Sequence, residues 1–367
     1  MEKRNLEVEK AIAYFSSKES HGMQFEVDGR DTQAPWVTVG VITVKRHVKQ
    51  EKYNGFKPKY VIEVAARLNQ ALEKFPAHQG DVHIHICNME RNSTNNDEAM
   101  YLARYMHMIE RHTNVKVEGD SNAEGEVPVD QFESEQRDYA FCLGEMAKFG
   151  AKYTIILQDD AVVHDNFFTN LKGILETKVE RRTTRGEVVN GNTDNLAQIK
   201  LYFPEKWQGY EWNVVSCLEL LSIGSFGGSL LLFFYGLFRG KIFNNRKQFR
   251  VAFCLSSLFC ILLASAIGRQ NLLVLQEKCG MYHIRPASHC CIPAVLYTRK
   301  GIDQITEYIK SPELKCSKDE PLDVAIGKYV DRIGMQQIAV VPNMVDHIGI
   351  FSTLHSAPKN PKSFFPK

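Results

Sequence analysis

Two long apolar runs, separated by a short basic stretch, limit what this chain can fold into. Residues 214–238 contain one charged side chain, Glu219, and residues 251–268 contain none. A helix needs about 20 apolar residues to cross the hydrocarbon core of a membrane, so the first run is long enough and the second lies at the short end of the range. We therefore expect a pair of transmembrane helices. A buried helical pair in a soluble protein is the alternative.

The stretch between the two runs predicts their orientation. Residues 239–250 carry five Lys or Arg side chains and no acidic one. Short basic loops stay on the cytoplasmic side of a membrane, so both flanks of this hairpin are expected to face the lumen. Close packing of the two helices is expected at small residues: Gly224, Gly227, Gly228 and Ser229 on the first, and Ser256, Ser257, Ala264 and Ser265 on the second.

The hairpin divides the chain into four parts. Residues 1–35 form a polar N-terminal segment, 36–213 the first part of a domain, 214–268 the transmembrane hairpin with its basic cytosolic loop, and 269–367 the second part of the domain. The N-terminal segment has no apolar core like that of a signal peptide or anchor. With luminal flanks, this predicts that an N-terminal anchor is missing from this sequence. The net charge of +2 argues against a nucleic-acid partner.

The nine cysteines fit the same topology. Cys279, Cys290, Cys291 and Cys316 crowd into the segment after the hairpin, where an oxidising lumen favours disulfides. Cys87 and Cys142 lie in apolar runs and are expected to be buried thiols. The chain has no CxxC pair, so a structural zinc site has little support.

Outside the hairpin, apolar strands alternate with helical patterns, which indicates an α/β domain with a mainly parallel sheet covered on both faces. Strands are expected at 36–46, 81–90, 115–118 and 153–163, and helices at 59–75, 98–111 and 133–149. The ligand crevice of such a sheet lies at the carboxyl ends of its strands.

Two adjacent carboxylates, Asp159 and Asp160, follow the buried strand at 153–157. They repel each other and lose hydration unless a cation offsets both costs. Oxygen ligands of this kind suit magnesium or manganese, and a divalent ion there would hold a diphosphate. An Asp-Asp pair after a strand is also found as a turn or helix cap, so this pattern alone leaves both interpretations open.

Five short blocks resemble the N-acetylglucosaminyltransferases that branch complex N-glycans. They are VTVGVITVKR ending at Arg46, EQRDYAFCL around Asp138, QDD at 158–160, DEPLDVAI at 319–326 and VDHIGIFSTL at 345–354. They occur in the family's order over some three hundred residues, although Gln158 stands where the family has glutamate. The resemblance implies a GT-A glycosyltransferase fold, Rossmann-like, split here by the hairpin.

A GT-A domain interrupted by tandem transmembrane helices resembles the post-GPI-attachment N-acetylgalactosaminyltransferase family more closely. This resemblance implies an enzyme of the Golgi membrane with a luminal catalytic domain. It implies an inverting transfer of GalNAc from UDP-GalNAc to the first mannose of the glycosylphosphatidylinositol (GPI) core of anchored proteins. The implied cofactor is a divalent metal, with Mn²⁺ the ion we expect.

The resemblance of the five blocks to the N-glycan-branching family implies roles for individual residues. Asp160 and His347 would hold the metal, with Asp159 beside it. The nucleotide pocket would contain Thr43, Arg46, Gln136, Asp138 and Tyr139. The base that takes the proton from the acceptor hydroxyl would be Asp323, with Glu320 and Asp319 as rivals.

Two other functions are compatible with this sequence. One is GlcNAc transfer to N-glycans, which would not need the hairpin. The other is a catalytically silent membrane protein or chaperone that keeps the fold.

The N-glycosylation sequon Asn92-Ser93-Thr94 would be usable only on the luminal side, so it predicts a luminal glycoprotein.

Overall fold

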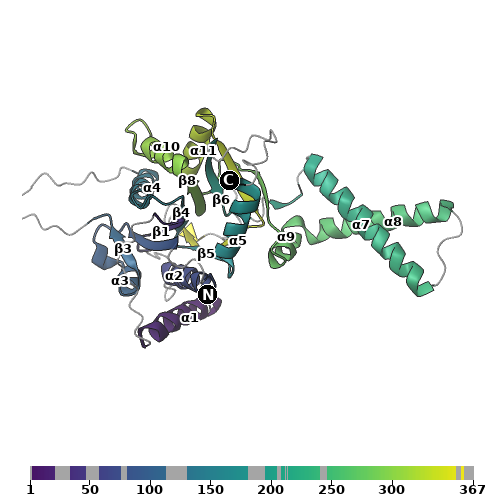
Figure 1. Ribbon diagram of the computed structural model, residues 1–367, viewed down its shortest axis with the longest axis horizontal. Coiled ribbons are helices and arrows are strands. Elements are labelled where there is room, and N and C mark those ends of the chain that lie inside the picture. The colour runs from purple at the N-terminus through teal and green to yellow at the C-terminus, as the bar shows by residue number, and fades with distance from the viewer. Residues whose placement is uncertain are drawn as a thin grey trace, which may run out of the picture. The chain divides into compact units, whose positions relative to one another are not determined.

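The computed structural model describes residues 2–20, 34–46, 58–75, 81–112, 130–180, 195–204, 208–210, 212, 214–239, 246–352 and 357–358. They form two compact units, one made of Met1–Phe203 with Tyr282–Lys367 and the other of Pro204–Met281. The first unit is an α/β domain and the second contains the two apolar helices (Figure 1). Each unit is described by itself below.

The α/β unit is built on an eight-stranded sheet with the order β3-β2-β1-β4-β8-β6-β9-β7. Six strands run in one direction, and β7 and β8 run in the other. The strands are β1 (Val37–Thr43), β2 (Val82–Asn88), β3 (His107–Glu110), β4 (Tyr153–Gln158), β6 (Leu196–Lys200), β7 (His283–Pro286), β8 (Ala294–Thr298) and β9 (Gln336–Val341). The predicted α/β class with a mainly parallel sheet is therefore confirmed.

Helices cover both faces of this sheet, because successive side chains of a strand point to opposite faces and both sets are apolar. Val39 of β1 and Ile155 of β4 belong to one core cluster, and Ile156 of β4 and Val295 of β8 belong to the other. The first face carries α1 (Glu2–Ser20), α2 (Tyr60–Glu73) and α5 (Phe167–Ile174), and the second carries α4 (Gln131–Ala147), α10 (Arg299–Lys310) and α11 (Leu322–Arg332) (Figure 1).

Four short strands form two small sheets beside the large one. β5 (Ala161–Val163) follows β4 after a two-residue turn, and β10 (Val345–His347) pairs with it in the antiparallel direction. A further two-stranded ribbon joins β11 (Phe351–Ser352) to β12 (Ala357–Pro358). The C-terminal segment is thus hydrogen-bonded to the turn that carries Asp159 and Asp160.

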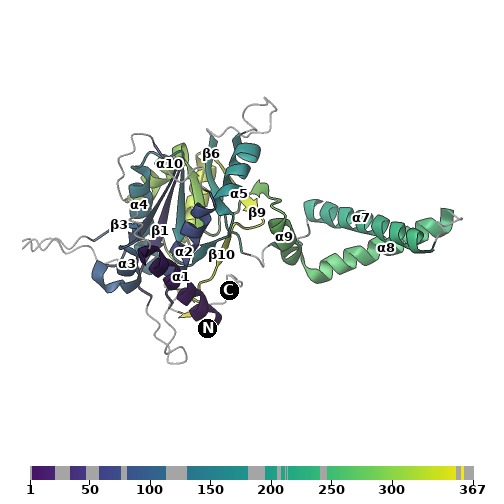
Figure 2. The same ribbon diagram turned by 60° about the horizontal axis from the view of Figure 1, so that its bottom comes forward.

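The polar N-terminal segment contributes a helix that its composition did not predict. α1 lies beside α2 in both views (Figure 2), and Phe15 of α1 is fully buried in the core. Arg4 of α1 donates to Glu63 of α2 across 2.9 Å. A second ion pair joins Lys18 of α1 to Glu73 of α2 across 2.6 Å. A buried aromatic ring and these ion pairs therefore hold α1 on the domain.

The region after β2 differs from the prediction. The helix expected to reach Arg111 ends at Leu102, as α3 (Asp97–Leu102), and His107–Glu110 is a strand instead. Sheet pairing explains the difference, because β3 extends the sheet along β2 with His85 opposite His107. The strand expected at residues 115–118 lies outside the described residues.

The expectation that Cys87 and Cys142 are free thiols is wrong, because they form a disulfide between β2 and α4. Gly40 of β1 makes the approach of α4 possible: a Cβ there would lie 2.9 Å from the Cys142 sulfur. Of the four cysteines after the hairpin, Cys290 and Cys291 are joined and Cys279 and Cys316 are free. The predicted disulfide in that segment is confirmed for this adjacent pair.

The second unit contains α7 (Val214–Arg239), α8 (Arg246–Ile267) and α9 (Arg269–Lys278). α7 and α8 are both long and apolar enough to cross a membrane. Only 11% and 6% of their most apolar windows are buried, which a core helix of a soluble protein would not show. Residues 240–245, the middle of the basic stretch between them, lie outside the described residues.

Small residues bring α7 and α8 together where the sequence predicted. A Cβ on Gly224 would lie 2.6 Å from Ile261, and one on Gly228 would lie 2.5 Å from the Ser257 hydroxyl. The charged Glu219 accepts from the Arg269 guanidinium across 2.9 Å. Because Arg269 begins α9 directly after α8, this ion pair joins the two ends of the hairpin.

Candidate active site

The two adjacent carboxylates occupy the turn between β4 and β5 and are almost completely buried. Asp159 is 6% exposed and Asp160 is 4% exposed. Buried carboxylates are stable only when cations or hydrogen bonds compensate their lost hydration. The groups around them therefore decide what this turn can bind.

Arg46, which lies three residues after the neighbouring strand β1, supplies that compensation. β1 and β4 are parallel neighbours, so their carboxyl ends meet at the same edge of the sheet. The Arg46 guanidinium forms an ion pair with Asp159 and lies 2.9 Å from Asp160 Oδ2. It also stacks over the Tyr60 ring at 4.9 Å. Thr43 Oγ1 donates to Asp159 Oδ2 across 3.4 Å.

The C-terminal segment closes over Asp160 from the other side. His347 ends β10, and its Nε2 lies 3.3 Å from Asp160 Oδ2. The Ile348 amide donates to the Asp160 carbonyl across 2.9 Å. A contact between residues 160 and 347 thus depends on the β5–β10 pairing, which places His347 opposite Ala161.

Charge and burial oppose each other at this pair. Burial raises the pKa of the Asp159 carboxyl, and the neighbouring Arg46 only partly offsets it. Burial also acts to raise the pKa of Asp160, but Arg46 and His347 outweigh it, so this pKa lies below its ordinary value. Asp160 is therefore the carboxylate that stays ionised most readily.

These residues fit a divalent cation. Asp160 Oδ2 faces Arg46 and His347, whereas Oδ1 is buried and has no hydrogen-bond partner among the described residues. A buried carboxylate oxygen without a donor is an available ligand. Carboxylate oxygen and imidazole nitrogen are both suitable ligands for manganese. A histidine that binds a metal is neutral, and with His347 neutral the two carboxylates and one guanidinium leave a net negative charge that attracts the ion.

Gly349 controls how closely the C-terminal segment approaches this site. A Cβ there would lie 2.0 Å from Asp160 Oδ2, far inside van der Waals contact. We expect Gly349→Ala to displace the Asp160 carboxylate and weaken Mn²⁺ binding about 10- to 100-fold, as outer-shell changes at metal sites do. Titration of the purified protein with Mn²⁺, followed by electron paramagnetic resonance, measures this affinity.

Gly173→Ala is the matched control for that prediction. Gly173 lies in α5, and a Cβ there meets no atom within 4 Å. Its Mn²⁺ affinity should equal that of the unchanged protein. Equal affinities for all three proteins would remove Asp160 from the metal site.

A second group of polar side chains surrounds Asp323, in the first turn of α11. Its carboxylate accepts from the Cys291 amide across 2.6 Å and from the Val324 amide across 2.8 Å. Cys291 lies two residues before Pro293, whose carbonyl accepts from the Gln158 amide across 2.8 Å. The Asp323 and Asp160 groups therefore lie along the same edge of the sheet, linked by residues 290–293.

The rival acids are less favourably placed for chemistry. Glu320 forms an exposed ion pair with Lys328 across 2.8 Å, and Asp319 is exposed. Asp323 is the member of this group whose carboxylate is oriented by two backbone amides. The geometry therefore favours Asp323 as a base, and its role stays a prediction.

Three residues predicted for the nucleotide pocket have other partners. Gln136 donates to the Ile309 and Leu314 carbonyls and accepts from the Cys316 amide. Tyr139 is 2% exposed and its hydroxyl bonds to Tyr297. These contacts attach α4 to the end of α10 and residues 314–316, and to β8.

The third of these residues, Asp138, forms an ion pair with Arg111. Burial raises the pKa of Asp138 to about 6, although Arg111 acts to lower it. None of the described contacts of Gln136, Asp138 or Tyr139 reaches Asp159 or Asp160, so their place in a nucleotide pocket remains a prediction.

Two charged residues beside Asp323 had no sequence signal of their own. Lys200 ends β6, is fully buried and donates to the Cys290 carbonyl. Burial lowers its pKa to about 8, against the charge of Asp323, which raises it. Burial, helped by Asp323 and Asp138, raises the pKa of Glu135 in α4 to about 7. Both depend on contacts between segments 90 or more residues apart, which no local pattern reveals.

One further group of potential metal ligands combines Cys290, Cys291 and Asp323. The two sulfurs are joined to each other in a disulfide. A metal ligand needs a thiolate, so the oxidised pair leaves only the carboxylate. We therefore place the candidate metal site at Asp160 and His347.

The chain is similar in sequence to a known family and in structure to a known transferase. A family model described as GPI-N-acetylgalactosamine transferase PGAP4 matches residues 37–346. Among solved structures, the mannosyltransferase PcManGT from Pyrobaculum calidifontis, determined with GDP-Man and Mn²⁺, is similar at 11% identity with a TM-score of 0.27. That similarity covers 54% of this chain, and the chain spans 45% of the length of that protein.

Proposed function

Because the chain belongs to the GPI-N-acetylgalactosamine transferase PGAP4 family, we propose that it transfers GalNAc from UDP-GalNAc to the first mannose of the GPI core. One observation carries the proposal. Thr43, Arg46, Asp159, Asp160 and His347 come from three separate parts of the chain and meet at the carboxyl ends of β1 and β4. That edge is where α/β sheets bind their ligands.

Asp160 and His347 would hold a divalent ion, Mn²⁺ in our proposal, beside the donor diphosphate. When bound, such an ion stabilises negative charge on the leaving phosphate as a Lewis acid. Arg46 would balance the Asp159 and Asp160 charges, and Thr43 would fix Asp159 beside the nucleotide. Arginine forms paired hydrogen bonds with phosphate oxygens, so Arg46 is also suited to the diphosphate itself.

The proposed transfer inverts the configuration at the sugar. The mannose hydroxyl attacks C1 of GalNAc from the face opposite UDP, the new C1–O bond forms, and UDP leaves with the electron pair of the broken bond. Asp323 takes the hydroxyl proton. A positioned carboxylate accelerates such a step about 10²- to 10⁴-fold.

The hairpin supports a membrane-bound acceptor. α7 and α8 would anchor the domain to the Golgi membrane with its catalytic site in the lumen, where a lipid-linked mannose stays near the surface. Tethering an enzyme next to its acceptor raises the effective concentration of both. A luminal site also agrees with disulfides, which form in oxidising compartments.

The deciding experiment uses cells that lack GPI-GalNAc transfer. Full-length protein should restore GalNAc on released GPI glycans, measured by mass spectrometry. Purified protein should use UDP-GalNAc with a GPI acceptor and lose activity in EDTA. Transfer of GlcNAc to N-glycan mannose instead would support the alternative enzyme, and no transfer with any of these pairs would support a silent member of the family.

Luminal placement makes a separate prediction at Asn92, which is exposed in a polar loop. The sequence contains this one N-glycosylation sequon. Glycosidase treatment of protein from cells should increase its gel mobility by one glycan, and Asn92→Gln should abolish the shift. Thr94→Ser keeps the sequon and should keep the shift. An unglycosylated chain with normal activity would place the domain outside the lumen.

A further inference from the structure

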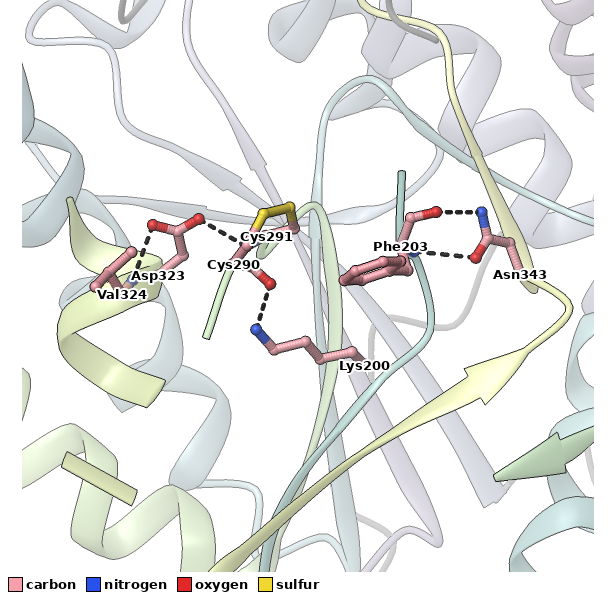
Figure 3. Close-up of a disulfide and its surroundings, with 7 residues drawn as sticks. All are labelled: Lys200, Phe203, Cys290, Cys291, Asp323, Val324 and Asn343. Carbon is pink, nitrogen blue, oxygen red and sulfur yellow. Dashed lines mark hydrogen bonds between the residues drawn. A yellow bond between two sulfur atoms is a disulfide. The ribbon is translucent and has the colours of Figure 1, made fainter. Parts of the chain in front are cut away.

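The segment of residues 290–293, which enters β8, connects the two carboxylate groups of the candidate site. It begins with adjacent cysteines, Cys290 and Cys291, that are joined in a disulfide. Figure 3 shows the backbone of these two cysteines between the Asp323 carboxylate and the Lys200 ammonium, with a hydrogen bond to each. This disulfide has no role in the catalytic steps proposed above.

One half of this disulfide, Cys291, is a direct hydrogen-bond partner of Asp323. Cys291 has a φ of +79°, a left-handed conformation that side chains other than glycine rarely adopt. In this conformation its amide donates to Asp323 Oδ2 across 2.6 Å. Unusual backbone geometry of this kind persists where the surrounding structure holds it, and it concentrates at functional sites.

Both ends of the segment are attached to the sheet. Lys200 Nζ donates to the Cys290 carbonyl, and the Gln158 amide donates to the Pro293 carbonyl across 2.8 Å. Gln158 directly precedes Asp159 and Asp160. The segment therefore spans from the carboxylate proposed as base to the strand that carries the proposed metal ligand, and Cys291 is its contact with the base.

We propose that the Cys290–Cys291 disulfide positions Asp323 for catalysis by holding the Cys291 amide on its carboxylate. The inference rests on the proposed function, in which Asp323 accepts the proton of the mannose hydroxyl. The second oxygen of Asp323 is held by Val324 in the same helix, so loss of the Cys291 contact leaves the carboxylate attached but free to rotate. Misplacement of a catalytic group by about 1 Å can reduce rates 10²-fold.

The test removes the disulfide in purified full-length protein. In Cys290→Ser/Cys291→Ser we expect kcat to fall about 10- to 100-fold, because a hydrogen bond to a charged group is lost. KM for UDP-GalNAc should stay within about twofold, because the nucleotide and metal residues are elsewhere. A merely structural role would change KM and thermal stability together with kcat. Cys279→Ser, which replaces an exposed free thiol, is the control and should behave like the unchanged protein.

A second measurement covers the case in which the double variant does not fold. A water-soluble phosphine reduces the disulfide in the folded protein: the phosphine is oxidised to its oxide with oxygen from water, and two electrons and two protons convert the disulfide to two thiols. Cys87 and Cys142 are both 0% exposed, whereas Cys290 is only partly buried, so the phosphine should reach the Cys290–Cys291 bond first. Mass spectrometry of the alkylated peptides identifies which bond was opened. Reduction of Cys290–Cys291 alone should lower kcat by the same factor, and reoxidation should restore it.

Asp323→Asn separates failure of this inference from failure of the proposed function. If Asp323→Asn retains full kcat, the base assignment is wrong. If Asp323→Asn is inactive but opening the disulfide leaves kcat unchanged, the positioning role alone is overturned. Alkylation of both cysteines in unfolded, unreduced protein would overturn it as well, because the disulfide would not exist. Additivity of the two losses in a combined variant would show that the disulfide does not act through Asp323.

Discussion

Asp160→Asn is expected to lower GalNAc transfer by roughly 10³-fold, which corresponds to about 4 kcal/mol of transition-state stabilisation. The change is nearly isosteric, so it removes charge without opening a cavity. Asp160 is the carboxylate on which Arg46 and His347 converge, and its second oxygen is buried without a donor. An amide there loses one negative charge and offers one oxygen where the carboxylate offers two.

The measurement is the initial rate of transfer from UDP-GalNAc to a GPI acceptor, over a range of Mn²⁺ concentrations. The variant should need more Mn²⁺ for its residual activity and should bind UDP more weakly. Asp165→Asn is a suitable control: Asp165 follows β5, is 62% exposed and pairs with Arg67 and Lys74 at the surface. Retention of more than a tenth of the activity by Asp160→Asn, with unchanged Mn²⁺ dependence, would rule out our metal site.

Much of the α/β fold could be predicted because its strands carry strong local signals. The alternation at residues 81–90 became β2, and the apolar run at 153–163 became β4 and β5, interrupted only at Asp159 and Asp160. The error at residues 103–111 has a different cause. The segment His107–Glu110 is too short for its sequence pattern to identify a strand, and its strand geometry comes from pairing with β2. Tertiary context decided that segment, as it often decides weak β propensity.

The candidate site, like the fold, could be predicted only in part from the sequence. Resemblance to known families indicated Asp160, Arg46 and His347, and the structure brings them together. The sequence could not identify Lys200 and the Cys291 amide as part of the site. They lie near Asp323 only because the fold brings β6 and residues 290–293 next to α11. Sequence motifs identify residues that touch a ligand, whereas the groups that orient those residues come from distant parts of the chain.

Gln136 and Tyr139 illustrate the opposite limit. Their motif resembles a family pattern for the nucleotide pocket, and their hydrogen bonds go to the end of α10 and the segment after it, for Gln136, and to Tyr297 of β8, for Tyr139. A residue can be characteristic of a family because it fixes the domain that supports a site. Substitution of either residue would therefore be expected to affect stability before it affects nucleotide binding.

The second large effect is expected at Asp323. Asp323→Asn should reduce kcat about 10²- to 10⁴-fold, the range that general-base catalysis contributes. The asparagine side chain keeps the oxygen that can accept from the Cys291 or Val324 amide, so the fold of α11 should be preserved. KM for UDP-GalNAc should change little, because the donor would be held by Arg46, Asp160 and His347. Transfer rates at saturating donor and acceptor, together with UDP binding, separate these two quantities.

Glu320→Gln is the matched control for Asp323→Asn, because it neutralises an acid three residues earlier. Glu320 is paired with Lys328 at the surface, and surface ion pairs contribute little. Its kcat should stay within about twofold of the unchanged enzyme. If Glu320→Gln is inactive and Asp323→Asn is not, Glu320 is the base and the Asp323 carboxylate serves to cap α11. If neither change lowers kcat, a carboxylate elsewhere takes the proton, and Glu135 becomes the next to test, because burial raises its pKa to about 7 beside Asp323.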